Sequence, residues 1–150
     1  MKNTRQMIPA VGLLATIIAS AYMVAQLKGQ ARVPTADFTN AAFAEVRDAQ
    51  GQAVLSGQFQ VADDDDDDVE RKAVLAPAGV DADAAGEAEV EFSKDAPINQ
   101  EVEFSIRNVA PNVAFTFLID GTTVATATAD RRGRAEVELD VRIPGTTASR

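Results

Sequence analysis

Charged or polar side chains alternate with apolar ones along Glu101-Val102-Glu103-Phe104-Ser105-Ile106-Arg107. The same alternation runs through residues 87–92 and 134–140. A strand turns successive side chains to opposite faces, so each stretch would have one dry face and one wet face. A helix would scatter the same residues around its circumference. These stretches therefore predict strands of an antiparallel sheet.

Residues 113–119 are more apolar, and a turn signal follows them directly. Their odd-numbered side chains, from Val113 to Ile119, share one face, as expected of a central strand. Asp120-Gly121 then separates them from a stretch rich in Thr, Val and Ala. Such a dipeptide between two strands is a strong signal for a two-residue hairpin turn. The expected cross-strand pairs are Ile119 with Thr122, Phe117 with Val124 and Phe115 with Thr126.

Short strands of this kind are expected along most of the chain. They fall near residues 42–47, 52–61, 69–76, 86–93, 101–107, 113–119, 122–129 and 134–142. Seven or eight short strands over about 100 residues, without alternating helices, indicate an antiparallel sandwich of immunoglobulin-like type. We therefore predict an all-β domain over residues 42–143. An N-terminal apolar helix and a linker over residues 32–41 would precede it, and a loose tail over residues 144–150 would follow it.

The N-terminus combines a basic start with a long apolar stretch. Lys2 and Arg5 precede apolar residues 7–25, which is the pattern of an export signal. The stretch is also long enough to span a bilayer as a helix. Two sites of small residues suit cleavage: Ala19-Ser20-Ala21 lies inside the apolar stretch, and Gly29-Gln30-Ala31 lies after it, directly behind Lys28. Residues 1–31 are therefore either a cleaved signal peptide or a single transmembrane anchor, and the sequence leaves both open.

Composition and charge narrow the classes of function. The chain contains no Cys and no His, and its net charge at pH 7 is −9. Disulfides, Cys nucleophiles and His-based catalytic triads are thereby excluded. All 23 acidic residues lie from Asp37 onward, whereas the bases Lys2, Arg5, Lys28 and Arg32 precede every acid. An acidic body of this kind repels nucleic acid and suits a cation or a protein partner.

A run of consecutive aspartates is the most conspicuous candidate site. Adjacent carboxylates repel one another, and Asp is a poor strand former, so we expect a solvated loop between strands. Carboxylate oxygens suit calcium, although an EF-hand would need Gly at Asp68 and Glu at Val74. A plain acidic loop is the favoured interpretation, and a loose calcium site is the alternative. The candidate metal ligands are Asp63, Asp64, Asp65, Asp66, Asp67 and Asp68.

The pattern Asp-x-x-Gly-x-Ala occurs at residues 48–53, 83–88 and 130–135. Asp at the first turn position can accept backbone N–H groups, and Gly at the fourth tolerates positive φ. The repeat is either a recurring ligand loop or, as we favour, recurring turn chemistry. The third copy carries the basic cluster Arg131, Arg132 and Arg134, which we interpret as a soluble turn tip rather than a grip for an anionic partner.

The remaining residues offer little for catalysis. The pairs Glu89/Glu91 and Glu101/Glu103 each share one face of a strand, but that face is the wet one. Nothing in the sequence would then raise a pKa as acid–base catalysis requires. We therefore expect a protein that is not an enzyme and that has no cofactor, with calcium as the one ion to consider.

A resemblance adds a broad expectation. Residues 110–121, with Val124-Ala125-Thr126 and residues 130–139, resemble a pattern in uncharacterised secreted bacterial proteins that have an immunoglobulin-like β-sandwich. The resemblance implies a bacterial envelope or secreted protein and carries no catalytic residues. The expected function is an exported, non-enzymatic module with a structural or binding role at the cell envelope. The alternative is a calcium-dependent adhesion or matrix module that uses the aspartate loop. Such a protein would be extracytoplasmic, and it would contact the membrane through residues 7–25 if the leader is retained.

Overall fold

The structure is a computed structural model, and it describes residues 35–64, 67–79, 81–94 and 99–145. These residues belong to one compact unit, residues 31–150, and within them every element of regular structure is a strand. The strands are β1 (Phe43–Arg47), β2 (Ala53–Gln58), β3 (Gln60–Asp64), β4 (Asp68–Pro77), β5 (Ala85–Ser93), β6 (Asn99–Arg107), β7 (Ala114–Ile119), β8 (Thr122–Thr128) and β9 (Ala135–Arg142). The all-β prediction is confirmed, whereas the expected N-terminal helix lies outside the described residues.

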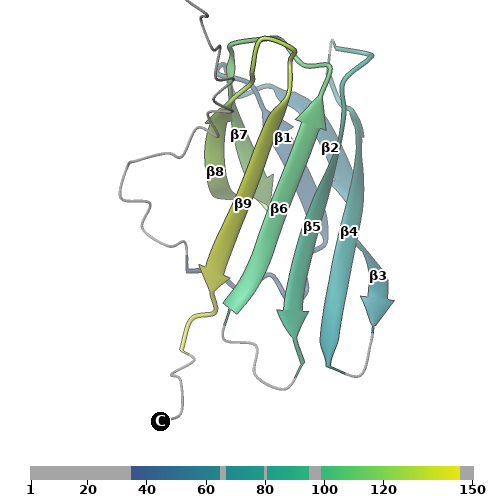
Figure 1. The fold of residues 1–150 in the computed structure, drawn as a ribbon, viewed down its shortest axis with the longest axis vertical. Coiled ribbons are helices and arrows are strands. Elements are labelled where there is room, and N and C mark those ends of the chain that lie inside the picture. The colour runs from purple at the N-terminus through teal and green to yellow at the C-terminus, as the bar shows by residue number, and fades with distance from the viewer. Residues whose placement is uncertain (1–34, 65–66, 80, 95–98, 146–150) are drawn as a thin grey trace, which may run out of the picture. The chain divides into compact units, whose positions relative to one another are not determined.

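All pairings between these strands are antiparallel, as predicted. The nine-stranded sheet has the order β8-β7-β1-β2-β4-β5-β6-β9, and β3 pairs with β4 beside this path. The sheet folds over so that a front layer of β3, β4, β5, β6 and β9 faces a back layer of β1, β2, β7 and β8 (Figure 1). Strand β4 takes part in both layers, because it pairs with β2 near Pro77 and with β5 along its length.

The predicted strand over residues 52–61 is divided into β2 and β3. Both parts pair with β4 in one continuous register, since Leu55 lies opposite Pro77 and Gln60 lies opposite Lys72. Gly57 lies between these pairs, and a Cβ at this position would collide with the backbone oxygen of Val74. The chain passes from the back layer into the front layer just beyond this close contact, between Gln58 and Gln60, which is why the sheet has nine strands rather than seven or eight.

The Asp120-Gly121 turn between β7 and β8 is present as predicted. Both residues have positive φ, 47° and 77°, as a two-residue hairpin turn of this hand requires. Ile119 lies opposite Thr122, but the register then shifts by one residue between Phe117 and Leu118. The predicted pairs of Phe117 with Val124 and of Phe115 with Thr126 are therefore wrong.

A β-bulge at Val124 explains this correction. Phe117 lies opposite Ala125, and Phe115 lies opposite Ala127. The extra residue allows Val124 to remain buried while Thr126 is exposed. Without the bulge, the alternation of β8 would point the polar Thr126 side chain into the apolar core.

The core fills the space between the two layers. Phe104 of β6 meets Phe117 of β7 with ring centroids 5.2 Å apart and a tilt of 60°, a favourable geometry for an aromatic pair. Val102 and Ile106 are buried on the same side of β6 as Phe104, while Glu101 is exposed on the other side. The alternation predicted for this strand is confirmed.

Two polar side chains, those of Asp120 and Gln100, form hydrogen bonds that hold the segment before β1 against the sheet. The Asp120 carboxylate accepts the backbone N–H of Phe43 at 2.8 Å and that of Ala42 at 3.2 Å. Gln100 is fully buried, and its side chain accepts from the Phe38 N–H at 2.6 Å and donates to the Ala36 carbonyl at 2.9 Å. Residues 36–43 are thus held by hydrogen bonds from β6 and from the β7–β8 turn.

Replacement of Gln100 should destabilise the fold strongly. Gln100→Leu leaves the Phe38 N–H and the Ala36 carbonyl without their present partner, and unsatisfied buried polar groups cost about 1–3 kcal/mol each. We expect the free energy of unfolding in urea to fall by about 3 kcal/mol. Gln60→Leu, on an exposed position of β3, is the control, and equal urea midpoints for the two variants would contradict this role.

Candidate binding face

One surface of the molecule gathers most of the described acidic side chains. It is the outer side of β4, β5, β6 and β9, which face the viewer in Figure 1. We call it the acidic face. It consists of Asp68, Glu70, Lys72, Glu87, Glu89, Glu91, Glu101, Glu103, Glu136, Glu138 and Asp140. Its residues alternate along each strand with the buried ones, so burial of the core positions forces the acids outward.

Sheet register arranges these acids in rows that run across the strands. Glu91 lies opposite Glu70 on one side and Glu101 on the other, and Glu101 lies opposite Asp140. This row, Glu70–Glu91–Glu101–Asp140, contains acids alone. The next row runs Lys72–Glu89–Glu103–Glu138. Like charges directly opposite one another destabilise a sheet, so this surface works against the stability of the fold.

Lys72 is the base that lies among these acids, whereas Arg107 and Arg142 are exposed on the same outer side at the ends of β6 and β9. Lys72 Nζ lies 2.7 Å from Glu70 Oε1 and 3.2 Å from Glu89 Oε2. Its hydrogen bond to Glu70, followed by the one to Glu89, raises the pKa of Lys72. Lys72 therefore offsets the repulsion around Glu70 and Glu89. Glu91, Glu101 and Glu103 lack a base opposite them in the sheet.

Two carboxyl groups of the acidic face, those of Glu91 and Glu103, have raised pKa values. Partial burial raises the pKa of Glu91, and Glu101 and Asp68 raise it further. Partial burial also raises the pKa of Glu103, with added contributions from the charges of Glu89 and Glu136. The sequence predicts a wet face where nothing would raise a pKa, and that expectation is wrong. Partial burial is the larger cause, and the charges that the cross-strand register brings near these carboxyl groups add to it.

The described residues of the aspartate run lie where β3 ends and β4 begins. Asp63 and Asp64 belong to β3 and Asp68 to β4, so the expected loop is shorter than the run. Asp65 and Asp66 lie outside the described residues. The part of the chain that the structure describes contains no group of three or more His, Cys, Asp or Glu side chains suited to a metal ion. The calcium site therefore stays a prediction.

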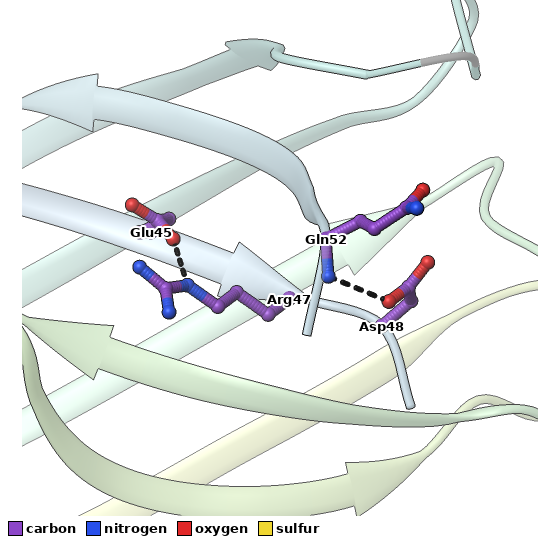
Figure 2. A network of polar contacts seen from close by, with 4 residues as sticks. All are labelled: Glu45, Arg47, Asp48 and Gln52. Carbon is purple, nitrogen blue, oxygen red and sulfur yellow. Dashed lines mark hydrogen bonds and ion pairs between the residues drawn. The ribbon is translucent and has the colours of Figure 1, made fainter. Parts of the chain in front are cut away.

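Two copies of the Asp-x-x-Gly-x-Ala pattern form the same turn. Asp48 Oδ1 accepts the backbone N–H of Gln50 and Gln52 at 2.9 and 2.8 Å (the bond to Gln52 is drawn in Figure 2). Asp130 Oδ1 accepts the backbone N–H of Arg132 and Arg134 at 2.7 and 3.0 Å. These bonds lower the pKa of Asp130. Both carboxylates thus serve their own turns, as turn chemistry requires.

The copy at Asp83 is different. The turn there starts two residues earlier, since the Ala84 N–H donates to the Asp81 carbonyl at 3.1 Å. Gly51 and Gly133 have positive φ, whereas Gly86 is an ordinary residue of β5. The repeat in the sequence therefore corresponds to a repeated structure at two of its three positions. The basic side chains of Arg131, Arg132 and Arg134 are exposed on the β8–β9 turn.

The outer side of the back layer contrasts with the acidic face. Its charged residues on β1 are Glu45 and Arg47, which form an ion pair with each other (Figure 2). The outward positions on β7 and β8 are neutral, as at Thr116, Thr123 and Thr126. Negative charge is therefore concentrated on one layer of the fold.

A shallow hollow of about 500 Å³ lies where the segment before β1 meets the β2–β3 bend. Its lining includes Asn40, Phe43, Gln58, Phe59 and Arg71 but no acidic residue. Arg71 Nε donates to the Thr39 carbonyl at 2.7 Å, which holds the guanidinium against the segment before β1. A pair of carboxyl groups for acid–base chemistry is not assembled in this hollow.

Comparisons with protein-family models, curated proteins and solved structures give no match to this chain. Among the described residues, no helix has the length and apolarity needed to cross a membrane, and residues 7–25 of the leader lie outside them. Function is therefore inferred from the fold and its surfaces.

Alanine substitution of the aspartate should lower stability at the two copies of the pattern that form the turn, and should change it little at the third. Asp48→Ala and Asp130→Ala each remove the acceptor of two backbone N–H groups, so both should lower the urea midpoint. Asp83→Ala is the matched control, because the turn beside it closes through the backbone of Asp81, and its midpoint should change little. A loss at Asp83 as large as that at Asp48 would contradict the assignment.

The raised pKa of Glu103 predicts a pH-dependent effect. The folded chain binds a proton at Glu103 more readily than the unfolded chain, whose carboxyl has the ordinary pKa of 4.5. The charged form therefore costs stability at neutral pH, and the cost disappears as pH falls through the raised pKa toward 4.5. Glu103→Gln should raise the urea midpoint at neutral pH and should have no such effect in acid.

Glu87→Gln is the matched control for this experiment. Glu87 of β5 lies on the same outer side of the sheet as Glu103, but its cross-strand neighbours are the uncharged Val74 and Ser105. Its substitution should change the midpoint less than Glu103→Gln does. An equal gain in both variants would mean that net charge, rather than the rows of acids, sets the stability of this face.

Proposed function

We propose that this protein is an exported, non-enzymatic β-sandwich module of immunoglobulin-like type that binds a basic protein partner at the bacterial cell envelope. The binding surface is the acidic face of β4, β5, β6 and β9. The observation that carries this proposal is the row Glu70–Glu91–Glu101–Asp140, in which neighbouring strands oppose acid with acid. Solubility alone does not require such an arrangement, because scattered charges achieve it without the cost of direct opposition.

Lys and Arg side chains of a partner would relieve this repulsion. A cation placed between Glu91 and Glu101 interacts favourably with both, as Lys72 already does with Glu70 and Glu89. Complementary charge also accelerates encounter and selects against acidic partners. A broad, slightly twisted sheet surface fits another protein better than it fits a small molecule, which needs a concave site. The same charge disfavours nucleic acid.

Export is supported by the leader. Lys2 and Arg5 before the apolar residues 7–25 are typical of export signals, and the protein is then secreted or held at the membrane by these residues. The mass of the native chain distinguishes the two states, because cleavage after Ala31 removes the leader. A non-enzymatic role is supported by the absence of His and Cys and by the position of the glutamate pairs on an open surface.

The aspartate run supports a second candidate, a calcium-dependent adhesion or matrix module. Asp68 belongs both to the run and to the acidic face, where it lies opposite Ser93, so the run reaches the negative surface at this residue. Carboxylate oxygens are ligands that calcium accepts. Calcium titration followed by calorimetry and thermal melting tests this candidate. The absence of both binding heat and a shift in melting temperature would exclude it.

A labelled decalysine peptide tests the acidic face directly. We expect Glu91→Gln/Glu101→Gln to weaken its binding about fivefold, ~1 kcal/mol, in fluorescence anisotropy at about 150 mM salt. Asp81→Asn/Asp83→Asn removes the same charge from the β4–β5 loop and should leave the affinity nearly unchanged. The first variant also removes repulsion between strands, so a loss of affinity would not arise from unfolding. Equal loss in the two variants, or no binding by the unmodified chain, would overturn the proposal.

A further inference from the structure

The free edges of the sheet differ in how well they are protected against pairing with another chain. The path of the sheet ends at β8 and at β9, and β3 has a partner on one side. Exposed edges invite pairing with another chain, and proteins commonly protect them with charge or with a covering segment. Strand β3 contains Asp63 and Asp64. Strand β9 contains acids, and its lower end is covered by a parallel bridge from Thr35 to Arg142.

Among the residues that the structure describes, strand β8 has neither kind of protection. Its sequence, Thr122–Thr128, contains no charged residue and no proline. It is longer than β3, and within the described part of the chain no strand pairs with it on the side away from β7. Among the free edges that the structure describes, β8 is the one with neutral side chains along its whole length.

Backbone groups on this free side lack strand partners. The Ile119–Thr122 pair closes the two-residue turn, and the Ala129 N–H donates to the Val113 carbonyl at 2.9 Å. Hydrogen-bonded pairs alternate with non-bonded pairs along an antiparallel ladder. Thr126, opposite Thr116, occupies a non-bonded position after the bulge. Its N–H and C=O therefore point away from β7 toward the free side.

Charge makes this edge the surface at which a second copy of the chain meets the least repulsion. Two molecules of net charge −9 repel one another, and the acidic face of the front layer is the worst surface for their approach. The edge of β8 and the adjoining outer side of the back layer are neutral, as at Thr116, Thr123 and Thr126. Approach through β8 keeps the two acidic faces apart while the free N–H and C=O groups acquire partners.

We propose that two copies of this protein pair antiparallel through β8, forming one sheet that continues across a two-fold axis near Thr126. In this arrangement Thr126 of one copy lies opposite Thr126 of the partner as a hydrogen-bonded pair. The side chains at this junction are Thr, Ala and Val, which fit a pleated surface without like-charge contacts. The acidic faces remain exposed on both copies, so the dimer presents two basic-partner surfaces.

Proline at position 126 tests the pairing without breaking the hairpin. Thr126→Pro removes an N–H that β7 does not use, and proline is tolerated on an edge strand when its missing N–H would face outward. The full chain, studied by sedimentation equilibrium in a density-matched detergent, should have twice the mass of its monomer. Thr126→Pro should have the monomer mass, and Thr126→Ala, which keeps the N–H, should remain dimeric. A monomeric unmodified chain, or a Thr126→Pro variant that is still dimeric, overturns the proposal.

A cysteine at the same position gives an independent readout. The chain contains no Cys, so an introduced thiol is unique. Hydrogen-bonded partners in an antiparallel ladder have Cα atoms about 5.5 Å apart, within the range of a disulfide. Under mild oxidation Thr126→Cys should give a covalent dimer on a non-reducing gel, whereas Ser105→Cys, exposed on β6, should not. Equal amounts of dimer from the two variants would exclude a two-fold axis at Thr126.

Discussion

The burial of Val90 against Val102 determines much of this molecule. These fully buried valines lie opposite each other on β5 and β6, and they fix the register of the two strands. Because side chains alternate along a strand, the residues that follow and precede them, Glu91 and Glu101, must also face each other, on the outside. The register that builds the core thus also builds the repulsive row of acids, and a slip by one residue would bury those acids.

Local features of the fold could be predicted from sequence. The alternation around Phe104 and the Asp120-Gly121 turn depend on neighbouring residues alone, and both are confirmed. The bend just beyond Gly57 and the bulge at Val124 could not be predicted, because each depends on what lies across the sheet: the backbone of Val74 beside Gly57 and the core beside β7 at the bulge. An isolated glycine in a strand was the one available sign of the bend.

The same division applies to the candidate site. The sequence showed pairs of glutamates two residues apart on single strands, and it placed them correctly on the outer surface. It could not show that several strands contribute to one row, since that requires knowledge of which strands are neighbours and in which register. The aspartate run is recognisable in the sequence because its residues are contiguous. The acidic face is assembled from residues as far apart as Glu70 and Asp140, and so it left no comparable signal.

The pairing of β4 with both layers has a mechanical consequence. Strand β4 is bonded through its backbone to β2 of the back layer and to β5 of the front layer. The two layers are therefore joined by a continuous hydrogen-bonded ladder as well as by side-chain packing. Sliding of the layers along this strand requires backbone hydrogen bonds of β4 to break, whereas on the opposite side β8 and β9 are not paired with each other and side-chain packing alone joins the layers. Shear between the layers is therefore resisted at β4 by bonds of fixed direction.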